Sequence, residues 1–229
     1  MLYLKHDIKI EIKNEKEVFR FVRLLLFTFI FSMAFLGVSD YIWNMTWYRI
    51  STFLIPWVVA IPAIANCIAR KVRWRELIGD HIAFQIFAGI GIGTVIAIAW
   101  IGFECMTQDA PLAQMYPQNI WDVFRILALY VFVIGPSEEL IYRVAIMGNL
   151  EELFPQKKWI APLVANSLFA MVHLIQNTWG NVVLAFVIGG IYTVLYYKWK
   201  KCGFLMVSVI HGIFDFMLAF LPFVWNKFI

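Results

Sequence analysis

The sequence contains little charge and few cysteines for its length. Asp, Glu, Lys and Arg make up 15% of the 229 residues, whereas 62% are hydrophobic. A soluble domain is about 45–50% apolar, so a soluble chain with this composition could not cover its surface. The three cysteines, Cys67, Cys105 and Cys202, lie far apart and form no CxxC pair. Their spacing argues against a disulfide framework and against a cysteine-based metal site.

Most of the sequence consists of long apolar runs. A helix that crosses a bilayer needs about 20 mostly apolar residues. We therefore expect an all-α integral membrane protein, a bundle of about seven transmembrane helices with no separate soluble domain. The expected spans are Phe19–Val38, Ile50–Ala69, Ile82–Phe103, Trp121–Ile134, Trp159–Ile175, Val182–Tyr197 and Phe204–Trp225. The stretch Pro136–Phe154 is expected to form an additional amphipathic or re-entrant helix. Glycines in the third and sixth runs are expected to allow close helix packing; they are Gly89, Gly91, Gly93, Gly189 and Gly190.

The basic residues alternate between loops. They occur in the N-terminal arm and again in Arg70–Arg75, Lys157–Lys158 and Lys198–Lys201, whereas Glu104–Ile120 has none. Because basic loops stay in the cytoplasm, we expect a multi-pass protein of the cell membrane with a cytoplasmic N-terminus and an extracytoplasmic C-terminus. The first apolar run is too long and too late for a cleavable signal peptide. The net charge of +4 is explained by these topology signals, so no nucleic-acid partner is expected.

Ionisable residues within apolar helices are unusual, because a charge at the bilayer centre costs about 2.5–3.5 kcal/mol. The first such group is GPSEELIYR at residues 135–143. Pro136 suits the first turn of a helix. Glu139 and Arg143 are four residues apart and can pair on one face, while Glu138 points about 100° away and stays free to act as a base. An interfacial helix start with a salt bridge explains the same residues equally well.

Two further groups contain histidine. His173 lies in the run from Trp159, and taken alone it is better explained as a hydrogen bond to a neighbouring helix. His211 and Asp215 lie four residues apart on one face of the last run. A carboxylate beside a histidine fixes the tautomer of the ring and raises its basicity. Together the groups contain what a hydrolytic site needs, a general base, a second proton carrier and a group that stabilises an oxyanion.

The signatures of three other membrane-protease types are missing. The chain has no HExxH helix, which disfavours a zincin-type site. It has no GxSG, since Glu138 stands where the last glycine belongs, and no GxGD with a matching second aspartate.

The remaining pattern resembles the CAAX protease and bacteriocin-processing family (CPBP, also called Abi). Members of this family carry EExxxR, FxxxH and then HxxxN or HxxxD on successive membrane helices. The matching residues here are Glu138, Glu139, Arg143, Phe169, His173, His211 and Asp215. The likeness covers roughly Trp121–Phe220. We therefore divide the chain into a cytoplasmic arm (1–18), transmembrane helices without a motif (19–120) and a CPBP-like catalytic region (121–229).

The resemblance implies an intramembrane endopeptidase acting on a membrane-associated peptide or a lipid-modified protein tail. Glu138 would activate water with help from His173, and Arg143 would hold Glu139. His211 and residue 215 would bind the oxyanion. The eukaryotic CAAX enzymes carry Asn where this chain has Asp215, and an ionised Asp can only accept hydrogen bonds. Asp215 is therefore expected to orient His211.

Several points stay open at this stage. His173, His211 and a glutamate could bind zinc, while a glutamate-dependent mechanism without metal fits the same residues. From the cytoplasmic side, His211 lies about 12 Å into its span and His173 about 14 residues into its own, so the helices must tilt for the two to meet. The alternative function is a non-enzymatic bacteriocin immunity or other membrane binding protein. A proton-coupled carrier is disfavoured because the chain has no internal repeat.

Overall fold

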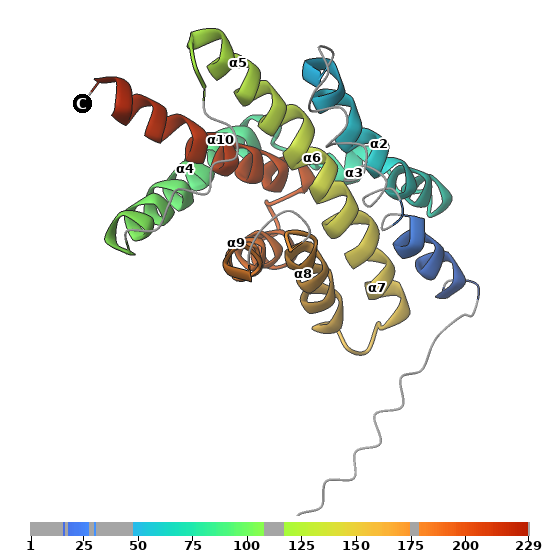
Figure 1. The fold of residues 1–229 in the computed structure, drawn as a ribbon. Helices are drawn as coiled ribbons and strands as arrows, with labels where there is room; N and C mark the ends of the chain where they lie inside the picture. The colour runs from blue at the N-terminus through green and yellow to red at the C-terminus, as the bar shows by residue number, and fades with distance from the viewer. Residues whose placement is uncertain are drawn as a thin grey trace, which may run out of the picture.

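The computed structural model describes residues 16, 18–27, 30, 48–107, 117–174 and 179–228. Within these ranges all regular secondary structure is helical, and residues 18–27 form part of a helix that precedes the labelled ones. The prediction of an all-α fold is confirmed for this part of the chain. Figure 1 shows the helices splayed around the centre of the molecule, where α10 crosses the long helix that contains α6.

Nine labelled α-helical elements lie in the described part of the chain. In chain order they are α2 (Tyr48–Ala69), α3 (Trp74–Ile78), α4 (Ile82–Thr107), α5 (Ile120–Leu129), α6 (Gly135–Glu139), α7 (Gly148–Leu153), α8 (Ile160–Val172), α9 (Trp179–Lys198) and α10 (Phe204–Phe228). Two π-helical segments, η1 (Tyr130–Ile134) and η2 (Leu140–Met147), lie on either side of α6.

Within the described residues, five helices are long and apolar enough to cross a membrane. They are Thr52–Ala69, Ile82–Phe103, Ile120–Leu153, Trp179–Lys198 and Phe204–Trp225. The protein is therefore a multi-pass membrane protein, but the predicted count of about seven spans is not confirmed. Half of the predicted span Phe19–Val38 lies outside the described residues. The predicted span Trp159–Ile175 appears as the shorter helix α8 of 13 residues.

The predicted span Trp121–Ile134 and the predicted amphipathic helix Pro136–Phe154 form one continuous helix. The structure thus corrects the expectation that a helix begins at Pro136. A proline inside an α-helix lacks a donor and collides with the carbonyl four residues back. Here η1 widens the turn before the proline, since the N–H of Gly135 donates to the carbonyl of Tyr130, five residues back. The helix continues through Pro136 because the wider turn makes room for its ring.

Close backbone contacts fix the crossing of α10 with this long helix. A Cβ atom built on Gly135 would lie 2.5 Å from the carbonyl oxygen of Ser208, and one on Gly212 would lie 2.5 Å from that of Tyr130. Only glycine at both positions lets the two backbones touch. Gly212 follows His211 directly, so this contact brings His211 to the Glu138–Glu139 segment.

α10 is the central helix of the bundle. Within its apolar window 67% of the residues are buried, against 17% in α4. α4 packs on α10 through Gly89 and Gly93, where an added Cβ would approach Val209 and Ile210. These contacts agree with the predicted packing role, whereas Gly91 has no such neighbour within 4 Å. The remaining faces of α4 expose apolar side chains suited to lipid.

Replacing Gly93 with Ala is expected to destabilise the protein in detergent by about 1–3 kcal/mol, the usual cost of overpacking. The new Cβ would lie 2.6 Å from the carbonyl oxygen of Ile210. The matched control is Gly91→Ala in the same helix, which gains helix propensity without a clash. Thermal unfolding in detergent measures both variants. Equal midpoints for Gly93→Ala and Gly91→Ala would show that α4 does not pack on α10 in this way.

Candidate active site

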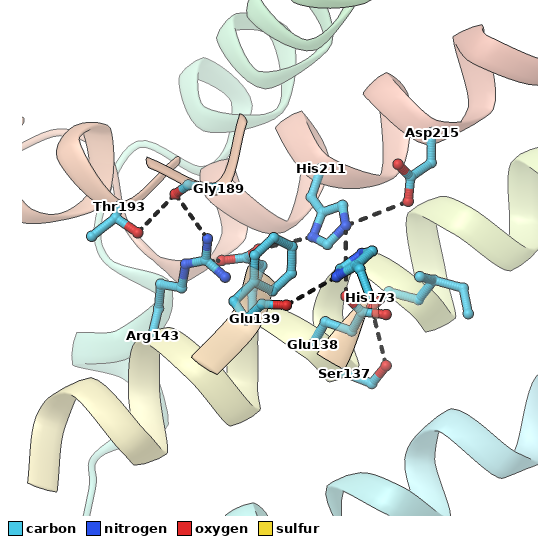
Figure 2. Close-up of polar contacts among 11 residues, drawn as sticks. Ser137, Glu138, Glu139, Arg143, His173, Gly189, Thr193, His211 and Asp215 are labelled. Atoms are coloured by element: carbon cyan, nitrogen blue, oxygen red, sulfur yellow. Dashed lines mark hydrogen bonds and ion pairs between the residues drawn. The ribbon is translucent and has the colours of Figure 1, made fainter. Parts of the chain in front are cut away.

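The predicted site residues converge where the long helix, α8 and α10 meet (Figure 2). At their centre lies Glu139, whose side chain is 0% exposed. Its Oε2 lies 3.1 Å from Nε of Arg143, as the four-residue spacing predicts. Its Oε1 lies 2.8 Å from Nδ1 of His211. Both oxygens of Glu139 are thus used to hold other residues of the site.

Arg143 is almost completely buried, and α9 fixes its guanidinium. Nη2 donates a 3.0 Å hydrogen bond to the carbonyl oxygen of Gly189, which also accepts from the hydroxyl of Thr193 at 2.8 Å. The guanidinium lies over the ring of Phe169, 4.4 Å from its centroid, a favourable cation–π arrangement. α9 carries none of the three motifs, so this support was not predicted from the sequence.

Gly189 is the residue of α9 that makes this arrangement possible. A Cβ atom at this position would lie 2.6 Å from the ring of Phe169 and 2.7 Å from Oδ1 of Asn166. The sequence predicted that this glycine allows close helix packing. It did not indicate that the packing partner would be Phe169 of the FxxxH motif, because that contact depends on how α8 and α9 pair.

Glu138 has a different environment from Glu139. Its side chain is 32% exposed, and its Oε2 lies 3.9 Å from Nε2 of His211. Asp215, with a side chain 23% exposed, places Oδ2 3.4 Å from the same nitrogen. Glu138 and Asp215 therefore face the accessible side of the site, and His211 lies between them and the buried Glu139. The nitrogen that faces Glu139 is Nδ1, so Glu139 as well as Asp215 holds the ring of His211.

His173 joins the site through Phe169. It caps the C-terminal end of α8, where its Nδ1 lies 2.9 Å from the carbonyl oxygen of Phe169. The ring of Phe169 contacts both histidine rings, with centroid distances of 5.0 Å to His173 and 5.7 Å to His211. His173 at the end of α8 thus reaches the same region as His211 near the start of α10. The steep crossing of the helices in Figure 1 allows this despite their different positions along their spans.

The arrangement of donors does not suit zinc. No three His, Cys, Asp or Glu side chains are grouped as a metal site requires in the part of the chain that the structure describes. Nδ1 of His211 faces Glu139, and Nδ1 of His173 lies against the carbonyl oxygen of Phe169, so Nε2 is the nitrogen of each ring that is left to bind a metal. To bind zinc, the Nε2 atoms of the predicted ligands His173 and His211 and a carboxylate would have to lie together in one tetrahedral arrangement.

The site lies within a segment that matches a known protein family. Residues 120–217 match the family described as type II CAAX prenyl endopeptidase Rce1-like. This region is similar to that family. The match includes all seven motif residues and confirms the predicted resemblance to CAAX-type intramembrane proteases. No curated protein and no solved structure gave a significant match to the chain. The first spans, before residue 120, lie outside the Rce1-like region.

Removing the guanidinium with Arg143→Met is expected to destabilise the protein by about 3–5 kcal/mol, because it leaves the buried carboxylate of Glu139 without its cation. The double variant Glu139→Gln/Arg143→Met removes both charges and is expected to recover part of this loss. Thermal or denaturant unfolding in detergent checks both. If adding Glu139→Gln to Arg143→Met lowers the stability further, as an independent second substitution would, the side chains of Glu139 and Arg143 are not coupled.

Proposed function

We propose that the protein is an intramembrane endopeptidase that uses Glu138 to activate water. One observation carries this proposal, the unequal environments of the two neighbouring glutamates. Glu139 is buried and held by Arg143 and His211. Glu138 is part-exposed, and among the described residues His211, at 3.9 Å, is the one basic side chain within salt-bridge distance of its carboxylate. A base has to reach water and exchange a proton, and Glu138 is placed for this.

In the proposed reaction a water molecule lies between Glu138 and the substrate carbonyl. Its oxygen attacks the carbonyl carbon while its proton moves to the carboxylate of Glu138, and His173 assists by orienting the water. The carbonyl oxygen becomes an oxyanion. When the tetrahedral intermediate collapses, the C–N bond breaks and the proton held by Glu138 moves to the leaving amine. The reaction consumes one water molecule and needs no other co-reactant.

His211 is proposed to stabilise the oxyanion. In its doubly protonated form the ring donates Nδ1–H to Glu139, 2.8 Å away, and Nε2–H points to the side shared by Glu138 and Asp215. A donor fixed in advance where negative charge develops is the most effective kind of electrostatic catalysis. Asp215 accepts from Nε2 before substrate binds and so helps to orient the ring.

The proposed substrate class is a peptide or protein tail held at the membrane, including lipid-modified tails of the type that the family description names. Glu138 and His211 lie within helices long and apolar enough to cross a membrane. A tail anchored by lipid or by an apolar segment reaches such a site by lateral movement, whereas a soluble peptide first has to leave water.

The isosteric change Glu138→Gln is expected to lower kcat about 10²–10⁴-fold, because an amide cannot accept the proton from water. Cleavage of a prenylated CAAX-type peptide, or of another confirmed substrate, by protein reconstituted in vesicles measures this. The matched control is Asp122→Asn in α5, a carboxylate of the same long helix outside the site. If Glu138→Gln cleaves as fast as the unchanged protein, Glu138 is not the base.

The mechanism is proposed to be glutamate-dependent and free of metal, because the donors do not form a zinc set. Purified protein is expected to contain far less than one zinc per chain by elemental analysis, and chelators are expected to leave cleavage unchanged. The variant His173→Ala/His211→Ala is the comparison for metal content. About one zinc per chain in the unchanged protein, lost in this variant, would instead establish a metalloprotease.

A further inference from the structure

A cavity of about 770 Å³ is lined by Arg143 but not by Glu138. The turn after α2, α3 and the turn after α9 form its rim, and the long helix forms its wall with Arg143, Val144 and Met147. This volume is typical of small-molecule sites. None of the groups proposed to react with substrate lines it, so the cavity is a space separate from the reaction site.

The lining of the cavity is rich in cations. Four of its residues, Arg70, Arg143, Lys200 and Lys201, are positively charged at pH 7, and three carboxylates also line it. Those carboxylates are Glu76, Asp80 and Glu151. Arg143 is paired with Glu139 and Arg70 with Glu152, so Lys200 and Lys201 are the cations left for a ligand. Glu76 is paired with Arg73, which lies outside the lining. Lys71 in the turn after α2, Arg75 in α3 and Lys198 at the end of α9 add positive charge near the cavity, so the field at this end of the bundle is positive.

Arg70 is held in the cavity wall. Its Nε and Nη2 contact Oε1 of Glu152 at 3.0 and 2.5 Å, and its Nη1 donates to the carbonyl oxygen of Val144 at 3.2 Å. A Cβ atom on Gly148 would lie 2.8 Å from this guanidinium. The glycine therefore leaves room for Arg70 to lie across the long helix, and the cation is in place before any ligand arrives.

Burial raises the pKa of Cys202, which also lines the cavity, to about 12, and the charge of Glu139 adds to the effect. The thiol therefore stays neutral at pH 7 and does not oppose an anion.

The aromatic residues around the cavity place it at head-group depth. Tyr196 and Tyr197 line it, and Trp74 in α3 is 45% exposed beside it. Trp199 packs edge-on against Phe84, over which Lys201 also lies. Tyr and Trp gather at membrane–water interfaces, and basic pockets between membrane helices on the cytoplasmic side bind anionic lipid head groups.

We propose that this cavity binds the phosphate of an anionic phospholipid head group, with Lys200 and Lys201 at its mouth and Arg70 in its wall. The proposal does not depend on the proposed proteolysis, because it concerns binding alone. Inorganic phosphate offers the same chemistry, and the experiment separates the two sources.

The test titrates the full chain, purified in detergent, with dioctanoylphosphatidylglycerol or dioctanoylphosphatidylcholine and follows binding by native mass spectrometry. The unchanged protein is expected to bind the anionic lipid and not the zwitterionic one. The variant Lys200→Gln/Lys201→Gln is expected to raise Kd roughly 30-fold, from two lysines at a charged surface. The control Lys157→Gln/Lys158→Gln removes the same charge from the turn between α7 and α8, outside the cavity, and is expected to leave Kd within about twofold.

Millimolar inorganic phosphate is added as a competitor. Competition would show that phosphate itself is recognised, and a lack of competition would show that the lipid is required; both agree with an anionic phosphate site. Equal affinity for the two lipids, or an equal loss of affinity in the two double variants, would overturn the proposal.

Discussion

The structure depends on a carboxylate that has no contact with water. Glu139 lies at the centre of apolar helices, and its charge is tolerated only because Arg143 and His211 each contact one of its oxygens. A buried pair contributes little net stability, but losing one partner is costly. The long helix and α10 are thus tied together by charge at the point where they cross, and Glu138, the next residue, is left free.

Close contacts at glycines build the frame for this contact. Gly135 and Gly212 let the backbones of the long helix and α10 touch, and Gly189 lets α9 approach Phe169. The carbonyl of Gly189 then supplies a partner for Arg143. In lipid, where apolar side chains gain little by leaving the solvent, close packing and internal hydrogen bonds have to hold helices together. The geometry of the site therefore depends on these glycines as well as on the ionisable residues.

Contacts within one helix could be predicted from the sequence. The pairing of Glu139 with Arg143 and the common face of His211 and Asp215 both follow from a spacing of four residues. The contact of Glu139 with His211 spans 72 positions of sequence, and nothing in the local pattern indicates which of the two glutamates faces the histidine. The same holds for the α9 carbonyl that binds Arg143.

The helix boundaries show a second limit of prediction from the sequence. Hydropathy separates the run before Pro136 from the amphipathic stretch after it, and proline usually ends or begins a helix. The structure joins the two because η1 relieves the collision, and a π-helical turn has no strong sequence signature. Such turns are frequent at functional sites, and here two of them lie on either side of the glutamate pair.

The shortness of α8 has a consequence for the surrounding membrane. Its 13 residues rise about 20 Å, whereas the hydrocarbon core of a bilayer is about 30 Å thick. Leu163 and Met171 are 45% and 47% exposed, so this helix presents apolar side chains outward. A lipid-facing helix this short is accommodated by local thinning of the bilayer or by flanking side chains that reach the interface, at a cost of fractions of a kcal/mol per ångström of mismatch. Either adjustment would act next to His173, at the end of α8.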